Sequence, residues 1–265
     1  MRIKLLISYD GTEFAGWQRQ PEDAVSVAGR STVQGTLEAA ISKIFNQQVR
    51  VVASGRTDAG VHAEAQVVHF DAPRELGETH LVRALNKLTP NSIAILKAWV
   101  APDEFHSLFS AEGKTYRYVI HNSPIPDAIG ARFSAHIEKP LDINRLNGLA
   151  EPILGKHDFK SFQTSGTEVK TTVRTISEAN WRRLEAPNKI EFRITGTGFL
   201  KQMVRNIVGT LIYLHQNEGT PADMKQILEA LDRRQAKNTA APEGLYLHSV
   251  YYPHELDNQC RELYN

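Results

Sequence analysis

Residues 48–70 read QVRVVASGRTDAGVHAEAQVVHF. The β-rich runs at 48–54 and 61–70 flank a short loop that is bounded by Gly55 and Gly60. Two such runs joined by a Gly-bounded loop are typical of a β-hairpin. The sequence therefore predicts two neighbouring antiparallel strands here, with Asp58 in the loop between them.

The residues on either side of this hairpin complete a β-α-β-β-α-β order. A strand is predicted at 2–9, and the apolar residues between Val33 and Phe45 recur at the spacing of an amphipathic helix. A second helix at 79–88 ends before Pro90, and residues 93–100 form a further strand. This order is the split-βαβ, ferredoxin-like arrangement.

The second part of the chain repeats the pattern with one added helix. Strands are predicted at 116–120, 172–184, 189–196 and 245–252, and helices at 142–154, 199–214 and 221–233. We therefore predict an α/β (α+β) fold of two ferredoxin-like βαββαβ domains, residues 1–105 and 106–265. Each domain has a mixed, largely antiparallel sheet flanked by helices. Loops at 20–31 and 122–130 are the predicted flexible segments.

The composition is that of an ordinary globular protein. The chain has 265 residues, of which 41% are hydrophobic. One cysteine, Cys260, cannot form an internal disulfide, so a reducing compartment fits best. The first ten residues lack the pattern of a signal peptide, and no apolar stretch is long enough to cross a bilayer. We expect a cytoplasmic protein that has no membrane contact.

The charge balance leaves two interpretations open. With 31 Lys+Arg against 30 Asp+Glu, the net charge of +1 does not by itself indicate a nucleic-acid partner. Basic residues concentrate between Arg174 and Lys237. They form either a basic face or a solvated surface of mixed charge.

Two short motifs match known binding sites only in part. His62-Ala63-Glu64 matches the H-x-E of zinc deaminases, but that site also needs a Pro-Cys-x-x-Cys pair. Gly196-Thr197-Gly198 begins a dinucleotide fingerprint but has Lys201 at the third glycine position. We therefore predict no metal and no cofactor.

Asp58 is the candidate for chemistry. An aspartate in a Gly-bounded turn commonly hydrogen-bonds its own backbone, which is the structural interpretation. The functional interpretation is a carboxylate at a strand end, kept ionised by an arginine and suited to nucleophilic attack on an electrophilic carbon. Arg56, two residues earlier, is a candidate for holding substrate.

Tyr116 and Arg205 are the other two candidates. Tyr116 and Tyr118 share one face of their strand, either as a half-buried aromatic pair or as an exposed platform for stacking unpaired bases. Arg205 lies in an apolar helical stretch, either on its solvent face or as a partner for a buried carboxylate.

Several blocks of residues resemble one family along almost the whole chain. They are Gly55–Ala63, Tyr9–Thr12, Gly16–Gln18, Thr32–Gln34, Lys114–Tyr118, His157–Phe159, Met203–Gly209 and Ala241–Leu247. The sequence they form resembles the TruA-type tRNA pseudouridine synthases, and Gly55–Ala63 resembles the signature loop of that family.

This resemblance implies a specific activity and specific site residues. Asp58 would be the catalytic aspartate, Tyr116 the tyrosine beside the target base, and Arg205 the arginine that pairs with Asp58. The family implies a homodimer without a cofactor that isomerises uridines at positions 38, 39 and 40 of the tRNA anticodon arm. Residues 1–105 would carry the Asp58 loop, and residues 106–265 would complete the active site and the RNA-binding surface.

Two features depart from the family pattern. Leu108 stands where the family usually has an arginine, and the segment between Trp17 and Val33 is longer than expected. Both departures concern contacts to RNA.

The reaction itself requires no redox partner. Pseudouridine formation breaks the N1–C1′ bond and joins C5 of the same uracil to C1′. An ionised carboxylate can assist by bonding the anomeric carbon, as in retaining glycosidases, or by removing a sugar proton. The rival functions are a non-catalytic RNA-binding protein and a nucleoside hydrolase that releases the base to water.

Overall fold

The computed structural model describes residues 1–19, 30–74, 80–164, 166 and 169–263. The chain forms two compact units, Met1–Glu112 with Leu247–Asn265, and Gly113–Tyr246. The chain therefore passes from the first unit to the second after Glu112 and returns after Tyr246.

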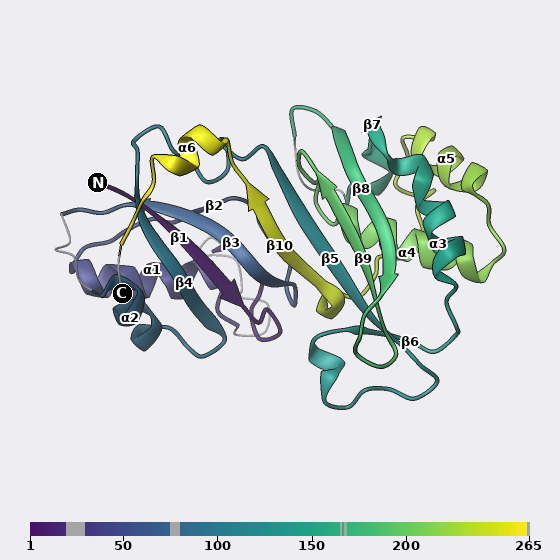
Figure 1. Cartoon of the computed structure of the whole chain (residues 1–265), viewed down its shortest axis with the longest axis horizontal. Helices are drawn as coiled ribbons and strands as arrows, with labels where there is room; N and C mark the ends of the chain where they lie inside the picture. The colour runs from purple at the N-terminus through teal and green to yellow at the C-terminus, as the bar shows by residue number, and fades with distance from the viewer. Residues whose placement is uncertain (20–29, 75–79, 165, 167–168, 264–265) are drawn as a thin grey trace. The chain divides into compact units, whose positions relative to one another are not determined.

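The first unit has the predicted β-α-β-β-α-β order (Figure 1). Its elements are β1 (Arg2–Tyr9), α1 (Val33–Phe45), β2 (Val52–Ala53), β3 (His62–Asp71), α2 (Leu81–Leu88) and β4 (Ile93–Ala101). The strands lie in the order β4-β1-β3-β2, and every neighbouring pair among them is antiparallel. The predicted hairpin of 48–54 and 61–70 corresponds to the β2–β3 pair. The predicted 79–88 helix begins at Leu81, and residue 79 lies outside the described part of the chain.

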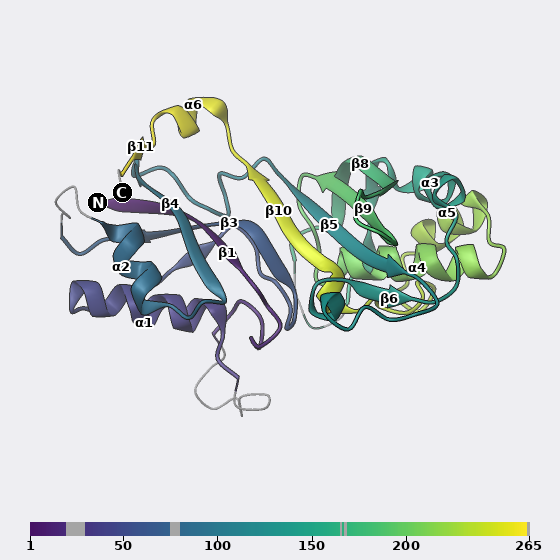
Figure 2. The same ribbon diagram turned by 60° about the horizontal axis from the view of Figure 1, so that its bottom comes forward.

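Alternating side chains of β1 build the core of this unit. Ile3, Leu5 and Ile7 are fully buried. Figure 2 shows α1 and α2 on one face of the sheet. The hydroxyl of Thr32 accepts a hydrogen bond from the amide of Gly35 and caps the start of α1. The predicted helix at this position is thus fixed by a polar cap and by its buried apolar side.

A C-terminal segment that the sequence did not predict covers the opposite face. It contains α6 (His254–Asn258) and β11 (Arg261–Glu262), which pairs with β4. The buried ammonium of Lys4 on β1 lies 2.6 Å from Asp257 and 5.0 Å from the ring centres of Trp99 and Tyr252. An ion pair and cation–π contacts therefore hold the end of the chain on the sheet.

The second unit contains a mixed sheet with helices. Its elements are β5 (Gly113–Asn122), β6 (Ala135–Ile137), α3 (Ile143–Ala150), β7 (Gly155–Asp158), β8 (Val173–Arg183), β9 (Lys189–Gly196), α4 (Met203–Gln216) and α5 (Pro221–Glu229). The order β5-β9-β8-β7 is antiparallel throughout, and β6 pairs with β5 in parallel. The last predicted strand is β10 (Leu245–Tyr251), of which Leu247–Tyr251 belongs to the first unit.

These elements confirm the α/β fold class, with largely antiparallel sheets and flanking helices. The ferredoxin-like nature of both halves and the boundary between residues 105 and 106 stay predictions. No helix in the described ranges is long and apolar enough to span a membrane.

Several predicted boundaries in the second part are wrong. The helix expected at 199–214 begins only at Met203, because Gln202 has a left-handed backbone (φ 58°). The helix expected at 221–233 ends at Glu229, shortly before Leu231, whose φ is also positive. The short strands β6 and β7 were not predicted. Most of the predicted loop at 20–31 lies outside the described residues, whereas Asp127 in the 122–130 loop pairs with Lys189 at 2.8 Å.

A close main-chain approach shapes the second unit. Gly209 in α4 faces the segment that follows α5, and a Cβ built on it would lie 1.7 Å from the carbonyl oxygen of Asn238. Only a residue without a side chain permits this contact. Gly148, inside α3, meets nothing within 4 Å of such an atom.

We expect the two glycines to respond in opposite ways to alanine. Gly148→Ala should raise the free energy of unfolding by about 0.5–1 kcal/mol, because alanine favours the helix and adds no clash. Gly209→Ala should lower it by about 1–3 kcal/mol, because the Asn238 carbonyl must move. Urea denaturation of the wild type and both variants measures the difference. Equal stability of the two variants would contradict the close approach.

Candidate active site

A buried glutamine holds the loop between β2 and β3 by hydrogen bonds. Gln66 on β3 is fully buried, and its amide nitrogen donates to the carbonyl oxygen of Gly55 at 2.9 Å. Its oxygen accepts a hydrogen bond from the Ser54 hydroxyl at 2.7 Å. The turn closes through the main chain, where the amide of Val61 donates to the carbonyl of Asp58 at 3.2 Å. The loop therefore has a defined backbone on which the Asp58 side chain is mounted.

A second segment clamps the loop from the side. The amide of Trp17 donates to the carbonyl of Thr57 at 3.0 Å. Gly16 has φ 98°, and a Cβ there would lie 2.9 Å from the same carbonyl oxygen. The hydroxyls of Tyr9 and Thr57 are 2.8 Å apart in a buried hydrogen bond. Burial raises the pKa of Tyr9 to about 12, so this hydroxyl stays protonated.

The residues that follow β1 also contact this loop closely. The amide of Gly11 donates to Nδ1 of His62 at 3.1 Å, and this nitrogen is 3.3 Å from the carboxylate of Asp10. A Cβ on Gly11 would lie 2.0 Å from the carbonyl oxygen of Val61. The blocks Tyr9–Thr12 and Gly16–Gln18, which carried part of the resemblance, thus surround the Asp58 loop within one unit.

Asp58 and Arg56 differ in exposure within this loop. The side chain of Asp58 is half-buried, and that of Arg56 is exposed. The clamp fixes the backbone that carries Asp58, and the Arg56 side chain lies at the surface.

Tyr116 and Tyr118 lie on the same face of β5, as predicted from their spacing, and both are buried. The ring of Tyr116 packs edge-on against Phe199, with centroids 5.0 Å apart. The hydroxyl of Tyr118 donates to the carbonyl of Ala241 at 2.8 Å, and burial raises its pKa. The pair is therefore not an exposed platform for stacking bases.

Arg205 projects from the first turn of α4 and is half-buried. Its Nε donates to the carbonyl of Ala240 at 2.7 Å, and its own carbonyl accepts from the amide of Ala240 at 3.0 Å. Asp58 belongs to the first unit and Arg205 to the second, so their pairing stays a prediction.

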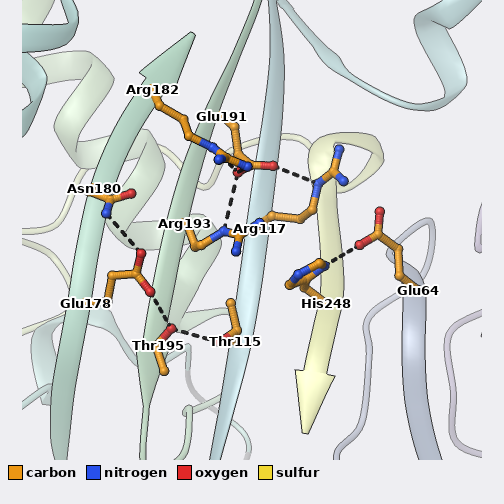
Figure 3. Close-up of polar contacts among 10 residues, drawn as sticks. All are labelled: Glu64, Thr115, Arg117, Glu178, Asn180, Arg182, Glu191, Arg193, Thr195 and His248. Atoms are coloured by element: carbon orange, nitrogen blue, oxygen red, sulfur yellow. Dashed lines mark hydrogen bonds and ion pairs between the residues drawn. The ribbon is translucent and has the colours of Figure 1, made fainter. Parts of the chain in front are cut away.

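Many of the basic residues between Arg174 and Lys237 have partners inside their own unit. Figure 3 shows Arg117, Arg182 and Arg193 around Glu191, which is 1% exposed. The shortest nitrogen–oxygen distances to this carboxylate are 3.0, 2.8 and 3.4 Å, respectively. Three guanidinium groups offset the cost of burying one carboxylate. Arg182 and Arg193 of this stretch, together with Arg117 on β5, are therefore ion-pair partners within their unit, which sequence spacing did not indicate.

A separate hydrogen bond links β10 to β3 within the first unit. Nδ1 of His248 lies 2.5 Å from the carboxylate of Glu64 (Figure 3). Glu64 is the acidic residue of the H-x-E motif, and this contact gives it a partner on a neighbouring strand. In the described part of the chain, no three His, Cys, Asp or Glu side chains gather as a metal site.

Comparisons with known proteins agree on one family. The family model for tRNA pseudouridine synthase matches residues 5–110 and 149–253. The tRNA pseudouridine synthase A of Bdellovibrio bacteriovorus is 48% identical over 266 residues, covering 99% of each chain. That of Bacillus subtilis is 43% identical over 254 residues, covering 95% of this chain and 99% of its own. That of Latilactobacillus sakei is 40% identical over 252 residues, covering 95% of this chain and 98% of its own.

A clamped Gly-bounded loop with a half-buried aspartate, on a helix-flanked antiparallel sheet, defines a candidate site for carboxylate chemistry. The family model and the relatives match most of the chain and thereby define the class of protein to which this site belongs. The chain belongs to the tRNA pseudouridine synthase family.

The clamp can be tested at Tyr9. Tyr9→Phe keeps the buried ring but removes the hydroxyl that bonds Thr57. We expect a loss of about 1–2 kcal/mol in unfolding free energy, because the Thr57 hydroxyl loses its buried partner. Thermal and urea denaturation measure this loss.

A matched control is Tyr213→Phe, since Tyr213 lies on the exposed side of α4. Its stability should stay within about 0.5 kcal/mol of the wild type. If Tyr9→Phe is as stable as Tyr213→Phe, the hydroxyl does not hold the loop.

Proposed function

We propose that this protein isomerises uridine to pseudouridine at positions 38, 39 and 40 of the tRNA anticodon arm, with Asp58 as the catalytic nucleophile. One observation carries the proposal. Asp58 lies in a loop that three neighbouring segments clamp, in a chain that matches the tRNA pseudouridine synthase family on both sides of it. The enzyme class is that of an isomerase acting as an intramolecular transferase.

The isomerisation of uridine requires little more than a positioned carboxylate. The N1–C1′ bond breaks, C5 joins C1′, the proton leaves C5, and N1 gains a proton. No electron acceptor is consumed. Asp58 either bonds C1′ and holds the sugar while the base turns, or removes a sugar proton to start the cleavage. Both routes require the ionised carboxylate, and both gain from a loop whose backbone is already fixed.

The other site residues take supporting roles in this proposal. Arg205 pairs with Asp58, keeps it charged and fixes its orientation. Tyr116, whose ring is largely buried against Phe199, lies beside the target base in this proposal, where its exposed edge contacts the base or its hydroxyl relays a proton. Arg56, exposed in the same loop as Asp58, contacts the RNA backbone around the displaced nucleotide.

The assembly and setting follow from the same resemblance. We propose that the protein works as a homodimer in the cytoplasm, without a cofactor. A target in a stem must leave its stack before it reacts, which costs a few kcal/mol, and contacts to the RNA backbone offset this cost.

Replacing the proposed nucleophile separates catalysis from the turn-forming interpretation. Asp58→Asn keeps the size of the side chain and removes its charge. We expect a folded protein that binds tRNA with nearly unchanged affinity and forms no detectable pseudouridine, because the lost interaction arises only along the reaction path. Asp103→Asn, at an exposed aspartate of the same unit, should keep wild-type turnover.

Chromatography of the digested RNA reads out this experiment and the rival functions together. A non-catalytic binder leaves uridine unchanged, whereas a hydrolase produces abasic RNA and free uracil. Full activity of Asp58→Asn would reduce the aspartate to a turn residue.

The proposed positions can be tested with tRNA transcripts that carry a single anticodon-arm uridine at 38, 39 or 40. We expect pseudouridine at each of these positions, and none in a transcript whose anticodon arm lacks all three uridines. Site-specific detection by chemical labelling and primer extension locates the product. Modification confined to another arm of the tRNA would refute the positional proposal.

A further inference from the structure

A buried asparagine lies in the first turn of α4. Asn206 is fully buried, and its amide nitrogen donates to the carbonyl of Phe162 at 2.8 Å and to the hydroxyl of Thr164 at 3.2 Å. Its oxygen accepts from Nη2 of Arg233 at 2.9 Å and from the Thr239 hydroxyl at 2.7 Å. Four partners satisfy the amide completely. The side chain therefore fixes the start of α4 against two other segments of its unit, Phe162–Thr164 and the segment that follows α5.

The same contacts fix the segment that follows α5. Nη1 of Arg233 donates to the carbonyl of Ala236 at 3.1 Å, and Nη2 also donates to the Thr239 hydroxyl at 3.0 Å. Gly209 lets the main chain at Asn238 approach α4 more closely than any side chain would allow. Residues 236–239 are thus held on the helix by side-chain hydrogen bonds and by shape.

Ala240, the residue that follows this segment, is hydrogen-bonded to Arg205. The amide and the carbonyl of Ala240 bond the backbone carbonyl and the Nε of Arg205, at 3.0 and 2.7 Å. A guanidinium is planar, so a fixed Nε–H···O bond restricts the plane in which its other nitrogens lie. Asn206 is hydrogen-bonded to Thr239, Thr239 is followed in the chain by Ala240, and Ala240 is hydrogen-bonded to the guanidinium of Arg205.

We propose that Thr239 and Arg233, held by Asn206, are positioning residues that set the orientation of the Arg205 guanidinium for catalysis. The inference rests on the proposed function, because it takes Arg205 as the partner of the catalytic carboxylate. Arg233 then belongs to the site's internal support, although its charge alone made it a candidate for a basic surface. Bidentate pairing with a carboxylate depends on that orientation.

Thr239→Val tests the inference, since it keeps the shape of the side chain and removes its hydroxyl. We expect kcat for tRNA to fall by about ten- to hundredfold, because a displacement of about 1 Å at a reacting group has an effect of this size. KM should change by less than about threefold, since the loss lies in the reaction step. Thr239→Ser should restore most of kcat.

Thr220→Val is the matched control. Thr220 caps α5 in the same unit, where its hydroxyl accepts from the amide of Asp223. Loss of this cap should lower the melting temperature and leave kcat unchanged. If kcat falls equally in Thr220→Val and Thr239→Val, the effect is general destabilisation and the inference is wrong.

A double-mutant cycle with Arg205→Lys shows whether the effect passes through Arg205. Lysine lacks the Nε–H donor to Ala240, so Thr239→Val should lower kcat little further in this background. Independent, multiplying losses would overturn the proposal. If Thr239→Val does not fold, Arg233→Met, which removes the same support, takes its place in the cycle.

Failure of the inference and failure of the proposed function give different results. Wild-type protein that forms no pseudouridine in tRNA would refute the function. Wild-type activity together with an unimpaired Thr239→Val would refute only the positioning role.

Discussion

The main-chain hydrogen bond from Trp17 to Thr57 is the contact on which the candidate site depends. It joins a loop between two strands to a segment about 40 residues earlier in the chain, and the Tyr9 and Gln66 side chains support it. A loop fixed in this way has little backbone entropy left to lose when substrate binds, which favours a preorganised position for Asp58. The glycines at 11 and 16 are required because their neighbours approach within the space of a Cβ.

In the second unit, polar side chains fix a segment beside Arg205, as the contacts described above fix the loop that carries Asp58. A segment without regular structure, residues 236–241, lies against α4, and its buried backbone groups need partners. Arg233 donates to the carbonyl of Ala236, Thr210 accepts from the amide of Lys237, and Arg205 bonds both main-chain groups of Ala240, while Gly209 permits the contact distance. Because the hydrogen bonds are directional, they select one arrangement of the segment, which hydrophobic packing alone would not do.

The sequence predicted the elements whose pattern is local, and it missed those set by distant contacts. The hairpin at 48–70 followed from two β-rich runs around a Gly-bounded loop, and the helix at Val33–Phe45 followed from its period. The late start of α4 depends on a left-handed Gln202, a conformation for which a glutamine gives no sequence indication. Asp58, Tyr116 and Arg205 were singled out from their local sequence and received their roles from the resemblance, whereas the contacts that hold the Asp58 loop and the Arg205 side chain appear only in the folded chain.

The arginines illustrate why charge counts are a poor guide to this protein. Glu191 engages three of them, and Asn206 accepts from Arg233, so these four arginines have a structural role within the second unit. A paired carboxylate offsets part of an arginine's attraction for phosphates, and a guanidinium held in one plane favours one specific pairing geometry. Catalysis gains from interactions that are stronger in the transition state than in the bound substrate, and fixed geometry provides these whereas diffuse attraction does not. A nearly neutral chain with internally held arginines is therefore compatible with an enzyme that acts on a polyanion.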